Sequence, residues 1–153
     1  MIRDPKKAFL ENLAVFAVQT LKTSKIPASV ILAQAALESN WGRSAPSFNF
    51  FGIKGAGPAG SRILWTTEIV KGKSIRVQQK FRKYHSAAEC FSDYPKMIAS
   101  SKWLRHALDH VESAEAYITA LQSGPAKYAT DTSYVSKILK IIKDYDLEIL
   151  DKK

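Results

Sequence analysis

The sequence predicts one α+β domain that is mainly helical and carries a single small β-lobe. Apolar residues recur at helical spacing through most of the chain, which favours amphipathic helices. One stretch, at about residues 61–84, is instead rich in β-branched and aromatic residues on both sides of a short turn sequence. A chain of 153 residues with 46% hydrophobic residues can bury one substantial core, so residues 1–153 are expected to form a single domain.

Two helices are expected before the β-lobe. Residues 5–22 have one apolar face at helical spacing, and Pro5 suits a first helical turn. Pro27 should open a second helix that runs to about Asn40. Its apolar residues surround most of the helix, which predicts a central and buried position.

The segment 43–62 is rich in Gly, Pro and Ser and is predicted to be a loop, whose glycines could form a hinge. A β-hairpin should follow, with strands at 63–71 and 73–83 and a turn at Lys71-Gly72-Lys73. The β-lobe would then stand beside the helical part of the domain.

The rest of the chain is predicted to be helical. Ser86 and Glu89 fit a capping box that starts a third helix, which Pro95 should kink or split. Further helices are expected at 102–109, 113–122 and 134–145. Asp131 or Thr132 could cap the last of these.

The charge indicates an anionic partner or environment. Lys and Arg number 23 against 14 Asp and Glu, which gives a net charge of +9. Nucleic acid, an anionic membrane surface and bacterial cell-wall polymers would all fit. The basic residues are scattered and no nucleic-acid-binding motif is present, so nucleic acid is not the expected partner. No apolar run reaches the roughly 18 residues that a membrane span requires.

The sequence offers little for metal or nucleophilic chemistry. His106 and His110 have a spacing that could hold zinc, but the motif lacks the expected glutamate and a third ligand. The single cysteine, Cys90, fits a small buried residue. We therefore expect no metal and no cofactor.

Glu38 is the acid that the pattern singles out. It follows Gln34 by four residues and Ile31 by seven, so the three share a helix face. A carboxyl group among apolar neighbours loses hydration and its pKa rises, as a glycosidase general acid requires. The alternative is a helix-end acid that is solvated or paired with Arg43.

Four blocks together resemble a known family. They read "AQAALESNWG", "NFFGIKG", "WTTEIVKGKSIRVQQKFRKYHSAAECFSDY" and "KYATDTSYVSKI". Their order and spacing are similar to those of bacterial endo-β-N-acetylglucosaminidases of glycoside hydrolase family 73, which cut peptidoglycan. The likeness covers about residues 10–143.

The resemblance implies a lysozyme-like fold whose glycan cleft lies between a helical lobe and the β-lobe. It implies Glu38 as catalytic acid, Glu68 as a second carboxylate and Tyr128 as a further catalytic residue. Glycan contacts are implied for Trp41, Asn49, Phe50, Trp65, Tyr94 and Tyr134. Phe51 and Phe81 are expected to lie in the core.

The expected function is hydrolysis of the β-1,4 bond between N-acetylglucosamine and N-acetylmuramic acid, by a monomer acting on peptidoglycan strands. A muramidase or lytic transglycosylase acting on the neighbouring bond is the alternative, and a non-catalytic wall-binding module is the alternative of another class. The N-terminal segment reads as a helix rather than a signal peptide. Action at the wall then suggests a phage lysis or virion enzyme, a secreted toxin, or a domain of a longer protein.

Overall fold

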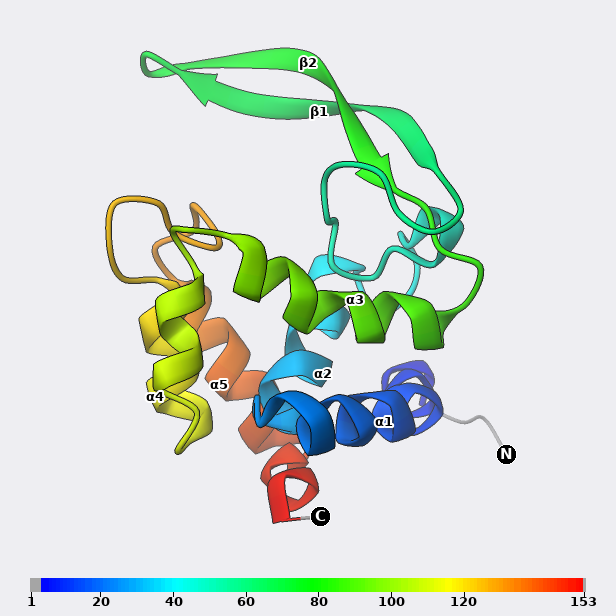
Figure 1. Cartoon of the computed structure of the whole chain (residues 1–153), viewed down its shortest axis with the longest axis vertical. Coiled ribbons are helices and arrows are strands. Elements are labelled where there is room, and N and C mark those ends of the chain that lie inside the picture. The colour runs from blue at the N-terminus through cyan, green and yellow to red at the C-terminus, as the bar shows by residue number, and fades with distance from the viewer. Residues whose placement is uncertain (1–3, 153) are drawn as a thin grey trace.

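The computed structural model describes residues 4–152 and has a helical body with a long β-hairpin at one end (Figure 1). This arrangement confirms the mainly helical α+β class. The principal elements are α1 (Pro5–Ser24), α2 (Ala28–Glu38), β1 (Ser61–Val70), β2 (Lys73–Arg82), α3 (Ala87–Ser100), α4 (Ala114–Leu121) and α5 (Tyr134–Asp144). Short 3-10 helices lie at η1 (Pro46–Phe48), η2 (Arg105–Asp109) and η3 (Leu147–Lys152). Within the described part of the chain, no helix has both the length and the hydropathy to cross a bilayer.

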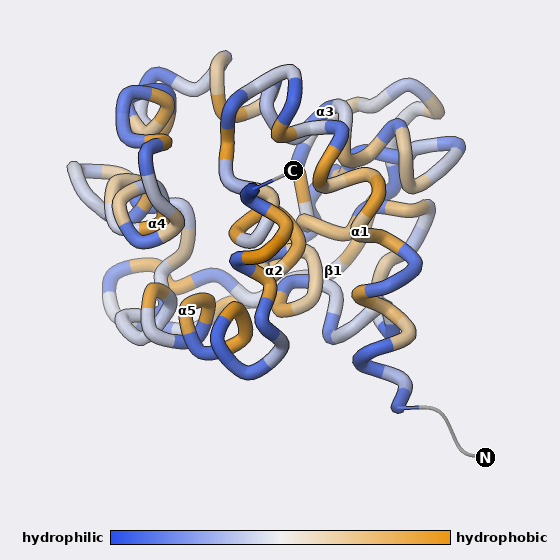
Figure 2. The backbone as a smooth tube through the Cα atoms, turned by 90° about the horizontal axis from the view of Figure 1, so that it is seen from below, coloured by the Kyte–Doolittle hydropathy of each residue, from blue (hydrophilic) through white to orange (hydrophobic). Residues whose placement is uncertain are grey.

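Helix α2 is the centre of the core, as its apolar circumference predicted. Every residue from 28 to 36 is buried. The helices α1, α4, α5 and η3 pack around it. In Figure 2, α2 is coloured as largely hydrophobic and lies between α1 and α5. The surrounding helices therefore hold the last turn of α2, and with it Glu38, in a fixed position.

The end of α2 is set by three residues with left-handed backbone angles. Asn40, Trp41 and Gly42 have φ values of 50°, 60° and 86°. The Trp41 N–H donates a 2.7 Å hydrogen bond back to the Ala36 carbonyl, which is the kind of bond that closes a helix C-terminus. The helix thus stops at Glu38 rather than near Asn40, and it begins after Pro27 rather than at it.

Helix α3 continues through Pro95 as a single helix, so of the two expected effects of Pro95, a kink or a split, the split does not occur. Proline cannot donate to the carbonyl four residues earlier, which here is that of Phe91. The Thr20 hydroxyl of α1 lies 3.3 Å from this carbonyl oxygen and also donates to the Phe16 carbonyl at 2.9 Å. A neighbouring helix therefore supplies a polar partner for the carbonyl that the proline leaves free.

The caps of the later helices differ in detail from the sequence patterns. The Ser86 hydroxyl accepts from the Glu89 N–H as predicted, but the Glu89 carboxylate accepts from the N–H of His85. At α5 the N-cap is Ser133, and the Asp131 carboxylate accepts a 2.8 Å hydrogen bond from its N–H. The predicted helix at 102–109 is the shorter 3-10 helix η2.

The hairpin is a continuous antiparallel ladder from Ser61 paired with Arg82 to Val70 paired with Lys73. Lys71 and Gly72 form the two-residue turn, both with positive φ, which is the type I′ geometry that suits the twist of a hairpin. Residues opposite each other in the ladder share a face, and successive residues alternate. The inner face carries Arg62, Leu64, Thr66 and Glu68 with Phe81, Gln79, Val77 and Ile75, and the outer face carries Ile63, Trp65, Thr67 and Ile69 with Lys80, Gln78, Arg76 and Ser74.

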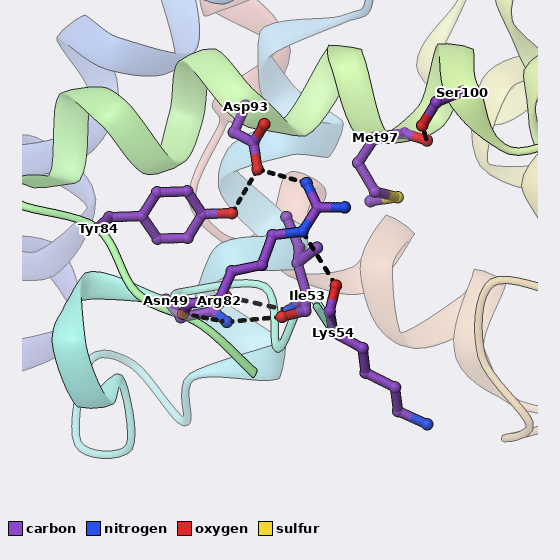
Figure 3. Close-up of polar contacts among 8 residues, drawn as sticks. All are labelled: Asn49, Ile53, Lys54, Arg82, Tyr84, Asp93, Met97 and Ser100. Atoms are coloured by element: carbon purple, nitrogen blue, oxygen red, sulfur yellow. Dashed lines mark hydrogen bonds and ion pairs between the residues drawn. The ribbon is translucent and has the colours of Figure 1, made fainter. Parts of the chain in front are cut away.

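A polar network fixes the base of the hairpin to the helical body (Figure 3). The Arg82 guanidinium donates to the Lys54 carbonyl at 2.9 Å and to the Asp93 carboxylate of α3 at 2.8 Å. Asp93 also accepts a 2.6 Å hydrogen bond from the Tyr84 hydroxyl. The amide of Asn49 donates to the carbonyls of Ile53 and Arg82. The loop before the hairpin is therefore hydrogen-bonded to β2, and β2 is bound to α3.

Candidate active site

Glu38 lies at a cavity of about 320 Å³ between the end of α2, the following loop and the inner face of the hairpin. The helix ends there, so the side chain is carried by a helix whose other turns are buried, yet it remains exposed at the cavity. The lining residues come from these three segments and are Glu38, Ser44, Pro46, Asn49, Gly52, Arg62, Leu64, Thr66, Phe81 and Arg82. The cavity is thus a cleft between the helical body and the β-lobe.

The pKa of Glu38 is raised above its ordinary value. The main cause is desolvation, because the surrounding atoms exclude water from the carboxylate. A hydrogen bond donated by the Tyr134 hydroxyl lowers the pKa and offsets part of this rise. Within residues 4–152 no ion pair joins Glu38 to Arg43, so the alternative of a salt-bridged helix-end acid has no support. Glu38 has the environment of a carboxyl group that stays protonated to a higher pH than usual.

A chain of buried hydrogen bonds runs from the core to Glu38. The Tyr94 hydroxyl donates to Gln34 Oε1 at 2.5 Å, so its contact of 2.7 Å with the Tyr117 hydroxyl must be one that it accepts. Gln34 Nε2 donates to the Tyr134 hydroxyl at 3.1 Å, which leaves the Tyr134 proton for Glu38. Every donor in this chain therefore points toward the carboxylate.

Tyr128 packs against Tyr134 and interacts electrostatically with Glu38. Its ring lies beside that of Tyr134, with 5.8 Å between the ring centroids. Burial raises the pKa of the Tyr128 hydroxyl, and the charges of Tyr134 and Glu38 act in the same direction. The structure therefore brings together three of the residues singled out from the sequence: Glu38, Tyr128 and Tyr134.

Glu68 projects from the inner face of the hairpin but does not line the cavity that holds Glu38. It lies two residues beyond Thr66, which is roughly 7 Å further along the strand toward the turn. Its carboxylate accepts hydrogen bonds from Lys54 Nζ at 3.2 Å and from Gln79 Nε2 at 3.4 Å. Glu68 therefore lies on the same face of the hairpin as the cavity residues Leu64 and Thr66 but outside the cavity, where Lys54 and Gln79 bind its carboxylate.

Trp65 lies on the opposite face of the same strand. Its side chain is 60% exposed on the outer face, and the Arg76 guanidinium stacks over its ring at 5.6 Å from the centroid. The structure therefore separates Trp65 from Glu38, because alternate residues of a strand point to opposite sides of the sheet.

Trp41 and Phe50 pack with other aromatic rings rather than lining the cavity. Trp41 contacts Phe9 and Tyr145, with centroid distances of 6.1 Å and 5.4 Å. Phe50 contacts Phe9 and Phe91, both at 6.1 Å. These contacts indicate packing roles and give no support to the glycan contacts expected of the two residues.

Tyr94 and Asn49 are also more deeply placed than expected. Tyr94 is fully buried beneath Gln34, so it can influence the cavity only through the hydrogen-bonded chain. Asn49 lines the cavity, but both of its amide N–H donors are taken by backbone carbonyls of the hairpin base. Phe51 is in the core as predicted, whereas Phe81 lines the cavity and the prediction that it is a core residue is wrong.

The histidines and the cysteine stand apart from this cavity. His106 Nε2 lies 2.8 Å from the Ala120 carbonyl and 3.1 Å from the Ser123 hydroxyl, so its ring links η2 to the end of α4. Cys90 is buried, and this burial raises the pKa of its thiol to about 12. The thiol is therefore a packing group at neutral pH.

Two groups of site residues carried no signal in the sequence. Tyr117 ends the hydrogen-bonded chain, but in the sequence it is one aromatic residue on the apolar face of α4. Arg62, Leu64 and Thr66 line the cavity through strand alternation. The alternation could have assigned them to one face, but only the folded chain shows which face meets Glu38.

Comparison with known proteins identifies the family. The pattern of the glucosaminidase family, described as mannosyl-glycoprotein endo-beta-N-acetylglucosaminidase, matches residues 14–147. This chain belongs to the glucosaminidase family. Glucosaminidases are glycoside hydrolases, so the resemblance noted in the four sequence blocks is confirmed.

Relatives of this glucosaminidase domain include an exo-glucosaminidase, LytG, from Bacillus subtilis, which is 33% identical over 97% of this chain and 55% of its own length. The peptidoglycan hydrolase FlgJ from Escherichia coli is 38% identical over 90% of this chain and 46% of its own length. The chain thus spans about half the length of these curated relatives.

The structure of the glucosaminidase domain is similar to the crystal structure of the catalytic domain of the autolysin Auto from Listeria monocytogenes. The TM-score is 0.85 at 30% sequence identity, over 98% of this chain and 89% of that domain. The expected lysozyme-like fold, with a β-hairpin lobe beside a helical lobe, is confirmed.

Proposed function

We propose that this glucosaminidase domain hydrolyses the β-1,4 bond between N-acetylglucosamine and N-acetylmuramic acid in peptidoglycan, with Glu38 as the general acid. The observation that carries the proposal is the position of Glu38, which faces the cavity from the end of a buried helix with a raised pKa. The names of LytG and FlgJ support a glycosidic bond of the cell wall as the target.

In this mechanism the protonated Glu38 donates its proton to the bridging oxygen as the glycosidic bond breaks. The positive charge that develops on the sugar is then quenched by a nucleophile, and water ends as the hydroxyl of the new reducing end. The reaction requires Glu38 to be protonated, so a raised pKa extends activity to higher pH. Tyr134 holds the carboxyl group and will stabilise the carboxylate that proton transfer leaves behind.

The group that assists water could be Glu68 or the substrate itself. Glu68 faces the same side of the hairpin as the cavity residues Leu64 and Thr66, which supports a role as second carboxylate. It would then have to leave Lys54 and Gln79 and approach the sugar. The alternative is attack by the 2-acetamido group of the substrate. Tyr128, beside Glu38, is proposed to orient that group or the water through its hydroxyl.

The proposed partner is the glycan strand of the bacterial wall, and the proposed place of action is the wall itself. The net charge of +9 supports attraction to a polymer that carries peptide carboxylates and other anionic groups. We propose that one copy is enough, because a single chain supplies Glu38, the rest of the cavity lining and the chain of hydrogen bonds behind it.

The test compares Glu38→Gln with Glu112→Gln, an exposed acid outside the cavity, on purified peptidoglycan. Glu38→Gln keeps the shape but removes the transferable proton, so wall clearing should fall by at least ~10²-fold, while Glu112→Gln should remain active. Near wild-type clearing by a folded Glu38→Gln protein would exclude the assignment, and a wild-type protein without clearing would indicate a binding module.

The released muropeptides identify the bond. Mass spectrometry should find N-acetylglucosamine at the new reducing ends. N-acetylmuramic acid at those ends would show a muramidase, and 1,6-anhydro products would show a lytic transglycosylase.

A further inference from the structure

The outer face of the hairpin carries a row of large apolar side chains in contact with water. Ile63, Trp65 and Ile69 are 59%, 60% and 69% exposed, and all three belong to β1. The row extends over roughly 20 Å, since a strand rises about 3.3 Å per residue. Most exposed apolar residues of a folded protein are scattered, so an aligned row of this kind marks a surface that meets a partner.

The strand beside this row has the opposite character. Lys80 lies opposite Ile63, Gln78 opposite Trp65, and Ser74 opposite Ile69. Arg76 completes the row and stacks over the ring of Trp65. On the outer face, β1 therefore contributes three apolar residues and one polar residue, Thr67 opposite Arg76, while β2 contributes only polar and basic residues.

The hairpin as a whole is strongly basic. Between Ser61 and Arg82 the sequence has six basic residues and a single acid, Glu68. That acid points to the inner face, where Lys54 binds it. Lys71 and Lys73 add positive charge at the turn, which lies at the end of the hairpin remote from the helical body (Figure 1). On the outer face, Arg76 and Lys80 flank the apolar row, and no acid of the ladder lies on that face.

We propose that the outer face of the hairpin binds the surface of a bilayer that contains anionic phospholipids. Ile63, Trp65 and Ile69 would enter the boundary between headgroups and acyl chains, where tryptophan is favoured. Arg76 and Lys80, from the adjacent strand, would lie at the level of the lipid phosphates. The combination of an aligned apolar row with flanking cations matches the two components of such an interface.

Charge separates this partner from a second copy of the chain. Two outer faces packed together would bring Arg76 and Lys80 of each copy close to those of the other, with no carboxylate on the face to balance them. An anionic lipid surface instead turns the same cations into attractive contacts.

The proposed surface leaves the cavity free. Leu64 and Thr66, which line the cavity, alternate along β1 with Ile63 and Trp65 and therefore point to the other side of the sheet. A domain attached to a bilayer through the outer face could hold a glycan against its inner face at the same time. The hairpin would then set the height of the cavity above the membrane.

The first experiment is sedimentation of the full chain with vesicles of phosphatidylcholine alone or mixed with phosphatidylglycerol. We expect binding to the mixed vesicles that weakens as salt increases, because exposed charges are screened. Equal binding to both kinds of vesicle, or no binding to either at low salt, would overturn the proposal.

Matched variants locate the surface. Replacing Ile63 and Ile69 with serine should weaken binding to the mixed vesicles by at least ~10-fold, as should Arg76→Gln combined with Lys80→Gln. The control replaces two other exposed apolar residues, Val15 and Ile149, with serine and should bind as the wild type does. Melting curves verify that each variant is folded, and equal loss in the control would overturn the assignment.

Trp65 reports the depth of insertion. The difference between the emission spectra of the wild type and Trp65→Phe isolates the fluorescence of Trp65. When the mixed vesicles are added, the maximum of this difference spectrum should shift to shorter wavelength. Sedimentation equilibrium without lipid tests the competing occupant, since dimers that disappear on replacing Ile63 and Ile69 would show that the face binds a second copy instead.

Discussion

Tyr94 donates a 2.5 Å hydrogen bond to Gln34 Oε1, and this bond fixes which way the amide of Gln34 faces. With its oxygen held by Tyr94, the amide presents Nε2 to the Tyr134 hydroxyl. Tyr134 is then free to donate to Glu38. A contact in the middle of the core thus decides the hydrogen bonding of an acid in the cavity.

Replacement of Tyr134 by phenylalanine should move the alkaline limit of activity to higher pH. In the wild type the hydrogen bond from Tyr134 lowers the pKa of Glu38. Its removal should raise that pKa, so Glu38 stays protonated to a higher pH. The buried Gln34 Nε2 also loses its acceptor, which should lower the free energy of unfolding by about 1–3 kcal/mol. Activity measured against pH on a soluble glycan tests the shift. Tyr117→Phe, at the far end of the chain of hydrogen bonds, is the control, and an equal shift in both variants would contradict the prediction.

The stability of Glu38→Gln relative to the wild type should be greater at neutral pH than in acid. Because burial raises the folded-state pKa of Glu38, the unfolded chain ionises first as pH rises. The contribution of the Glu38 carboxyl to the free energy of unfolding is complete below its ordinary pKa. That contribution is lost as pH rises through the raised pKa of the folded protein. Melting temperatures of both proteins between pH 4 and pH 8 measure this effect, and the advantage of the variant should grow with pH. A constant difference across that range would show that the environment of Glu38 is not perturbed.

Asp93→Ala should loosen the attachment of the hairpin. It removes the acceptor shared by Arg82 and Tyr84, so unfolding in urea should become easier by about 1–3 kcal/mol. Amide exchange should also become faster in the loop at 53–60, which this network holds. Asp144→Ala breaks an exposed pair with Lys140 and should have little effect. Unchanged exchange in the loop would mean that the network does not restrain it.

Glu68→Gln should lower turnover by less than Glu38→Gln, with the glycan still bound. Water activated by Glu68 and attack by the 2-acetamido group predict different anomeric configurations for the first product, and NMR can follow this configuration. Net inversion with a large effect of Glu68→Gln supports a carboxylate that activates water. Net retention with an effect below ~10-fold, or ~1.4 kcal/mol of barrier, supports attack by the acetamido group.

Local patterns were sufficient for much of this fold. The apolar circumference of α2 predicted its central position, and the turn sequence around Gly72 predicted the hairpin almost to its ends. Pro95 does not split α3, and the Thr20 hydroxyl that meets the free Phe91 carbonyl lies on another helix and approaches only in the folded chain. A rule based on neighbours in sequence cannot include such a partner.

The candidate site was predictable in its acid but not in its surroundings. Glu38 was identifiable because it interrupts an apolar run at a helix end. The aromatic residues near it had no such distinction, since Trp41 in an aromatic cluster and Tyr94 in the core look alike in sequence to residues of a cleft. Their roles depend on which direction each ring takes, and tertiary packing sets that direction.

The two-residue turn at Lys71 and Gly72 limits how the hairpin can change length. Adding one residue to each strand would advance the tip by roughly 3.3 Å and exchange the sides to which its outermost residues point. Adding two to each strand would restore the original sides. Hairpins of related domains should therefore differ by whole pairs of ladder positions, so an insertion of four residues is the smallest that keeps every residue beyond it on its original inner or outer face.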